Sequence, residues 1–154
     1  MAKRNSWLLS GILTGAIGAI TTAAAIAAYG KRKEGSAWTP FNAIAHMALG
    51  EQTIQKEGYS SPETLTGLGL HSSAVLTWGA MYEKLAGKTP FPKSLATGAA
   101  ASGIIYLLDY HILPPKMRPG FEKRLGNQSV ATVYGLLALV LGLSPLWKQS
   151  KGKG

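Results

Sequence analysis

Residues 7–30 read WLLSGILTGAIGAITTAAAIAAYG, a stretch of 24 residues that contains no Asp, Glu, Lys or Arg. A helix rises about 1.5 Å per residue, so crossing about 30 Å of hydrocarbon takes roughly 20 residues. Lys3-Arg4 before the stretch and Ala23-Ala24-Ala25 within it imitate a secretory signal peptide. The stretch is longer than the apolar region of such a peptide, so we interpret it as a membrane span.

Three further blocks of the sequence have the same character. They cover residues 64–82, 94–113 and 127–147, and their interior ionisable side chains are only His71, Asp109 and His111. Core helices of soluble proteins are usually apolar on one side only. Together the blocks predict an all-α fold: an integral membrane bundle of four transmembrane helices, in a single domain over residues 1–154.

A short helix is predicted at residues 40–49, in the loop between the first two spans. It opens with a proline and stops before Gly50. Its apolar residues follow the i, i+3, i+4, i+7 spacing of one helical face: Phe41, Ile44, Ala45 and Ala48. Ten residues cannot cross a bilayer, so we expect this helix to lie at the membrane interface or to cap the bundle.

The chain is basic, with 16 Lys and Arg against 7 Asp and Glu and a net charge of +9. The basic residues cluster beside the apolar blocks, which favours contact with lipid headgroups. No nucleic-acid recognition motif accompanies them, and we expect no nucleic-acid partner. The sequence has no Cys, which excludes a disulfide, a thiolate metal site and a catalytic thiol.

The orientation in the membrane is not decided by counting positive charges. Four spans place both termini and residues 83–93 on one side, and eight Lys and Arg then lie on each side. The positive-inside rule is therefore tied. The first helix usually dominates the insertion, and on that ground we expect the termini in the cytoplasm.

Polar side chains inside or next to the blocks are the candidate functional residues, because such groups are costly in hydrocarbon. Their depth along antiparallel helices places them in one half of the membrane, on the side of the first and third loops. The candidates are His71, Asp109, Tyr106, Tyr134, His46 and Asn42. The first interpretation is a hydrogen-bonded polar core, in which Asp109 pairs with His71 or Tyr134 and fixes the helix register.

Two functional alternatives use the same residues. One is a metal or redox site with His46, His71 and Asp109 as nitrogen and oxygen ligands. The other is a proton or solute pathway. Asp109 and His111 are two residues apart, so a helix would turn them away from each other and one ion could not reach both. No H-E-x-x-H, nucleophile or Walker motif is present, and we assign no catalytic residue and no cofactor.

Gly11 and Gly15 form a G-x-x-x-G pattern in the first span. Such a pattern lets two helices approach closely, either within a bundle or between two chains. The span is so rich in Gly and Ala that the match is expected by chance. We therefore predict that these glycines pack inside the bundle.

Several motifs follow one another in the order found in a bacterial family. They are WTPFNAIAH at 38–46, HSS at 71–73 with Trp78 and Tyr82-Glu83, and DYHILPPKMRPGFE at 109–122. In these motifs the chain resembles an uncharacterised family of small bacterial inner-membrane proteins with four predicted transmembrane helices, although Leu113 to Arg118 departs from the family form. The resemblance implies a bacterial inner membrane and four spans, and it implies no reaction.

From these features we expect a small accessory or interaction subunit rather than an enzyme. Its expected partners are the lipid bilayer and other membrane proteins, including further copies of itself. The first alternative is a membrane-embedded metal or redox protein, and the second is a small oligomeric transporter or channel.

Overall fold

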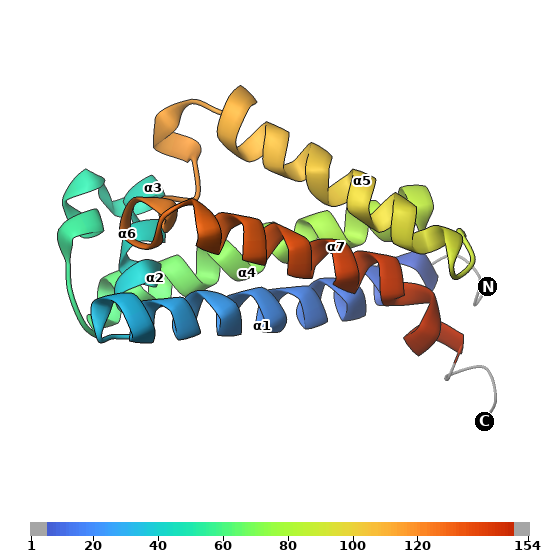
Figure 1. Cartoon of the computed structure of the whole chain (residues 1–154), viewed down its shortest axis with the longest axis horizontal. Helices are drawn as coiled ribbons and strands as arrows, with labels where there is room; N and C mark the ends of the chain where they lie inside the picture. The colour runs from blue at the N-terminus through green and yellow to red at the C-terminus, as the bar shows by residue number, and fades with distance from the viewer. Residues whose placement is uncertain (1–5, 150–154) are drawn as a thin grey trace.

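The structure, a computed structural model, describes residues 6–149 and consists of helices joined by short loops (Figure 1). Four long helices run side by side: α1 (Ser6–Glu34), α4 (Ser61–Ala86), α5 (Lys93–Leu107) and α7 (Asn127–Gln149). The short elements are α2 (Thr39–Ile44), α3 (His46–Leu49), α6 (Glu122–Leu125), the 3₁₀ turns η1 (Glu51–Gln55) and η3 (Pro115–Met117), and the π-helical turn η2 (Leu108–Ile112). No strand occurs within residues 6–149, so the all-α prediction is confirmed.

The long helices are not equally packed. Helix α1 lies against α4 and α7, whereas α5 packs on α7 and barely touches α4. Figure 1 shows α5 leaning away from the other helices toward its C-terminal end, while α2, α3 and α6 gather at the end where α1 finishes and α4 begins. This arrangement leaves one side of the bundle loosely covered.

Helices α1 and α4 approach each other through glycine. A Cβ atom on Gly11 would lie 2.6 Å from the Cα atom of Ala80, and one on Gly79 would lie 2.5 Å from the Cα atom of Gly15. No side chain fits at either point without moving a backbone. The prediction that Gly11 and Gly15 pack inside the bundle is confirmed.

The helix predicted at 40–49 is two short helices, interrupted at Ala45. The expected single apolar stripe is also wrong, because all six residues of α2 are buried. Helix α2 packs against α1, α4 and α6, so it closes the end of the bundle and has no free face. Its contact with α4 is so close that a Cβ atom on Gly67 would overlap the carbonyl oxygen of Phe41.

Length and composition identify two helices that could cross a membrane, Ser6–Glu34 and Asn127–Lys148. Helix α4 has 26 residues but carries His71 with several Thr and Ser. Helix α5 has only 15 α-helical residues, because the next five form the π turn. The four membrane spans therefore stay a prediction, and α4 and α5 do not pass this test of length and composition within residues 6–149.

Candidate functional site

Helices α4, α5 and α7 enclose a cavity of about 440 Å³ near the capped end of the bundle. Three of the predicted residues line it: His71 from α4, Asp109 from the π turn, and Tyr134 from α7. The rest of the wall is mostly apolar and includes Val75 and Leu137. The structure thus brings together half of the predicted polar cluster.

Asp109 and Tyr134 are directly bonded. The Tyr134 hydroxyl donates to Oδ2 of Asp109 over 2.6 Å, which is one of the two pairings expected from the sequence. No residue in the described range hydrogen-bonds the other carboxylate oxygen. Asp109 reaches the cavity from a π-helical turn, a rare form that often occurs at functional sites.

His71 is held by Thr22 of α1, whose Oγ1 lies 2.9 Å from Nε2 of the imidazole. The Thr22 hydroxyl also lies 2.7 Å from the carbonyl oxygen of Gly18, and this bond uses its only proton. Nε2 of His71 must then be the donor to Thr22. The ring also donates to the backbone carbonyl of Ala19, and this bond comes from the same protonated Nε2, so Nδ1 of the neutral ring is left as an acceptor.

His46 lies apart from this cavity. Its Nδ1 donates to the carbonyl oxygen of Ala43 over 2.7 Å, its ring packs against Gly120, and its buried Nε2 has no partner in the described part of the chain. The predicted ligand set of His46, His71 and Asp109 is therefore not assembled. Within residues 6–149 no group of three or more His, Asp or Glu is placed to hold a metal ion.

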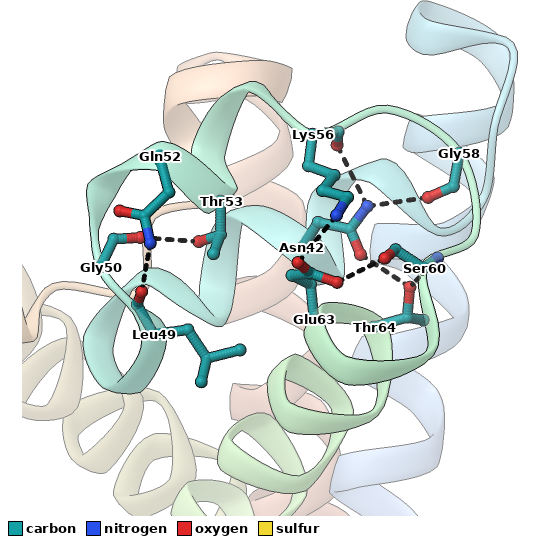
Figure 2. Close-up of polar contacts among 10 residues, drawn as sticks. All are labelled: Asn42, Leu49, Gly50, Gln52, Thr53, Lys56, Gly58, Ser60, Glu63 and Thr64. Atoms are coloured by element: carbon teal, nitrogen blue, oxygen red, sulfur yellow. Dashed lines mark hydrogen bonds and ion pairs between the residues drawn. The ribbon is translucent and has the colours of Figure 1, made fainter.

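Asn42 clamps the capped end and does not reach the cavity (Figure 2). Its amide nitrogen donates to the carbonyl oxygens of Lys56 and Gly58, over 3.0 and 2.7 Å. Its amide oxygen accepts from Thr64 over 2.6 Å. A fully buried side chain thus ties the loop before α4 to the first turn of α4, which is a structural role.

The first turn of α4 is stabilised by charge as well. Glu63 accepts hydrogen bonds from Ser60 and from Lys56, and its Oε1 lies 3.0 Å from Nζ of Lys56 (Figure 2). The Ser60 bond first, and then the Lys56 bond, lower the pKa of Glu63 from 4.5 to about 2. An ionised Glu63 also suits the positive end of the helix dipole.

Tyr106 belongs to the opposite face of α5. It lines a second cavity of about 460 Å³ between α5 and α7, to which Tyr110 and Glu122 also contribute. Its ring packs edge-on against Tyr134, with centroids 5.4 Å apart. Tyr134 lines both cavities, so it separates the Tyr106 side from the His71 side.

A buried ion pair at the other end of the bundle was not predicted from the sequence. Nζ of Lys148 lies 2.6 Å from Oε2 of Glu83, and Thr14 donates to Oε1 of Glu83 over 2.8 Å. Lys148 also donates to the carbonyl oxygen of Gly87 over 2.7 Å. The sequence does contain a signal for this pair. Glu83 directly follows the second block and Lys148 directly follows the fourth, and four antiparallel spans would place both residues on the same side of the membrane.

No family model, curated protein or solved structure matches the chain. The resemblance to an inner-membrane family therefore stays a prediction, and the geometry of the described residues carries the argument about function.

Proposed function

We propose that this chain is a four-span integral protein of the bacterial inner membrane that acts as an accessory or interaction subunit. One observation carries the proposal: the long helices expose large apolar side chains to their surroundings, while Thr, Ser and Gly residues are buried among the apolar residues of the core. That distribution is opposite to the one expected of a soluble bundle, whose polar groups face water.

The outward side of the long helices is mostly apolar, although α4 also exposes Ser73 and Thr77. The most exposed apolar side chain on α4 is Leu85 at 81 %, and on α1 it is Ile20 at 72 %. Exposed residues of the same kind along the four helices are Leu9, Ile12, Leu65, Met81, Ile104, Leu107 and Leu139. A surface of this extent would associate in water, whereas in a bilayer it needs no further cover.

The inward side holds the polar groups, and they are hydrogen-bonded between helices. Ser94 and Ser102 of α5 donate to the carbonyl oxygens of Gly142 and Tyr134 of α7, each over 2.6 Å. Membrane helices lack a hydrophobic force between them, so small residues and such bonds replace it. The contact of α5 with α7 has this character.

Two features support the proposal that α4 and α5 also span the membrane, in addition to α1 and α7. Helix α4 is about 39 Å long at 1.5 Å per residue, which exceeds the hydrocarbon thickness. Helix α5 and its π turn together cover residues 93–112, which is close to the roughly 20 residues that a span requires.

An accessory role is supported by the outward face of α5. Ala96, Ala100 and Gly103 are exposed there, and a Cβ atom on Gly103 would meet nothing within 4 Å. Small residues on a lipid-facing surface allow a helix of another protein to approach closely. We assign this face to partner contact.

Membrane placement is tested by cysteine labelling, for which the natural absence of Cys is an advantage. Single Cys at Ile20 and Ile104 should resist a water-soluble maleimide in intact membranes, although 72 % and 58 % of these side chains are exposed in the isolated chain. Fast labelling at Ile104 alone would reduce the number of spans. Fast labelling at both positions would refute the proposal.

The same method gives the topology. Glu57→Cys and Lys123→Cys should label from one side of the membrane and Lys88→Cys from the other.

The accessory role is tested by cross-linking. A partner that is cross-linked to the native chain in membranes should be lost in Ala100→Phe. It should be kept in Ala24→Phe, which places the same bulk on the outward side of α1. Equal loss in both variants, or no partner at all, would contradict an accessory role.

A further inference from the structure

The cavity between α4, α5 and α7 has the character of a small-molecule site. Its volume of about 440 Å³ falls in the range of roughly 300–1,000 Å³ that such sites occupy. The wall is mainly apolar, and polar groups converge at one place.

Asp109 and His71, at the cavity wall, each have one hydrogen-bond acceptor that no described residue uses. One carboxylate oxygen of Asp109 accepts a hydrogen bond from Tyr134, and Nε2 of His71 donates one to Thr22. The remaining carboxylate oxygen and Nδ1 are both acceptors with no partner in the described residues. Two acceptors without donors in an apolar wall are costly, so an occupant that donates a hydrogen bond is favoured.

The polar and the apolar parts of the cavity wall lie at different positions along the bundle. His71 and Asp109 line it toward the capped end of the bundle, and Trp78 lines it further along α4. Seven residues separate His71 from Trp78, which is roughly 10 Å along the helix axis. An occupant with a polar head and an apolar chain would therefore place its head at Asp109 and its chain toward Trp78.

The path into the cavity runs between helices. Helix α5 barely touches α4, and it leans away from the bundle at the end that carries Asp109 (Figure 1). Given the membrane placement proposed above, this side faces the hydrocarbon. A molecule dissolved in the bilayer can enter there.

We propose that this cavity binds a membrane-dissolved amphiphile whose head carries a hydroxyl group, which donates its hydrogen bond to Asp109, with His71 as the alternative acceptor. The inference rests on the proposed membrane placement and adds a ligand class to it. Tyr134 positions the Asp109 carboxylate, and Thr22 sets the His71 tautomer. An apolar chain fills the remainder against Val75 and Leu137.

The test uses protein in lipid nanodiscs and the probe 8-bromooctan-1-ol, whose chain is about as long as the separation of His71 from Trp78. Bromine quenches tryptophan on contact, so a bound probe reduces the fluorescence of Trp78. We expect saturable quenching that is absent in Trp78→Phe. The methyl ether of the probe cannot donate, and it should bind about tenfold more weakly, which corresponds to the loss of one hydrogen bond.

Substitutions at Asp109 and His71 test whether these residues cause the preference for the alcohol over its methyl ether. Asp109→Asn can still accept from Tyr134 but presents an amide to the cavity, so the preference for the alcohol over the ether should fall severalfold. Adding His71→Phe should abolish it. His111→Gln, two residues from Asp109 on an exposed position, should keep the full preference.

The proposal is overturned if quenching rises linearly with the probe concentration, because that result would show that the probe only partitions into the lipid. It is also overturned if alcohol and ether bind equally, which is occupation by an acyl chain with no recognition of the head. The cysteine labelling described above is run on the same nanodiscs. Protected Ile20 and Ile104 with no saturable quenching would refute the ligand site and leave the membrane placement standing.

Discussion

The Asn42 clamp and the Asp109–His71 cavity lie toward the same end of the molecule and use similar polar side chains in different ways. Every hydrogen-bonding group of the Asn42 side chain is occupied by the loop or by Thr64. Asp109 and His71 line a cavity, and each bonds a neighbouring side chain through one atom, Oδ2 and Nε2 respectively. A buried polar group that is satisfied internally holds the fold, whereas one left half satisfied at a cavity wall is available to a ligand.

The largest effect on stability is expected for Asn42→Ala. The substitution removes three hydrogen bonds: those to the part-buried carbonyl oxygens of Lys56 and Gly58 and the one from the buried Thr64 hydroxyl, each worth about 1 kcal/mol. We predict a loss of roughly 3 kcal/mol in the free energy of unfolding, measured by denaturation in detergent. Asn42→Asp keeps the acceptor for Thr64 but turns a carboxylate oxygen toward the carbonyl oxygens of Lys56 and Gly58, so it should be at least as destabilising as Asn42→Ala. Wild-type stability in Asn42→Ala would contradict the clamp.

Gly67→Ala tests the close contact that holds the clamp against α4. The new Cβ atom would overlap the carbonyl oxygen of Phe41, so α2 must move, and overpacking of this kind costs about 1–3 kcal/mol. Gly69→Ala, two residues further along α4, meets nothing within 4 Å. It should be neutral or raise stability by up to about 1 kcal/mol. Equal thermal midpoints for both variants would argue against the contact.

Tyr134→Phe is the corresponding change at the cavity, and its effect on stability should be smaller. It removes one half-buried hydrogen bond to Asp109, worth about 1 kcal/mol. Its effect on the cavity should exceed its effect on the fold, because Asp109 is then no longer held toward the ligand. The alcohol probe should bind several times more weakly, with unfolding little changed. A large loss of stability without weaker binding would make Asp109 and Tyr134 a structural pair like the clamp.

The smallest effect is expected from Glu63, at the surface beside the clamp. Its folded pKa of about 2 is below its ordinary value of 4.5, so its contribution is present above pH 4.5 and is lost as the pH falls toward 2. The thermal midpoint of the wild type should exceed that of Glu63→Gln at pH 6, and the two should converge toward pH 2. Glu51→Gln, which removes a carboxylate with no ion pair in the described residues, is the matched control. A constant difference across this range would show that the Ser60 and Lys56 bonds do not depend on ionised Glu63.

The sequence by itself predicted the helices and part of the site. Charge-free blocks and proline and glycine boundaries placed the ends of α1, α4 and α7 to within four residues, because these signals are local, whereas the block that ends at residue 113 extends past the end of α5 at Leu107 into the π turn. Depth along antiparallel helices was enough to bring His71, Asp109 and Tyr134 together. It failed for His46 and Tyr106, since the direction of a side chain around its helix depends on which neighbour the helix packs against.

Only the tertiary structure decided which polar groups are satisfied. The three bonds of Asn42 come from backbone and side chains 14 to 22 residues away, and the proton on Nε2 of His71 follows from Thr22 on another helix. Packing of α5 on α7 rather than on α4 opened the cavity. A sequence specifies which residues are polar and roughly how deep they lie, but hydrogen-bond partners and empty volume are properties of several helices together.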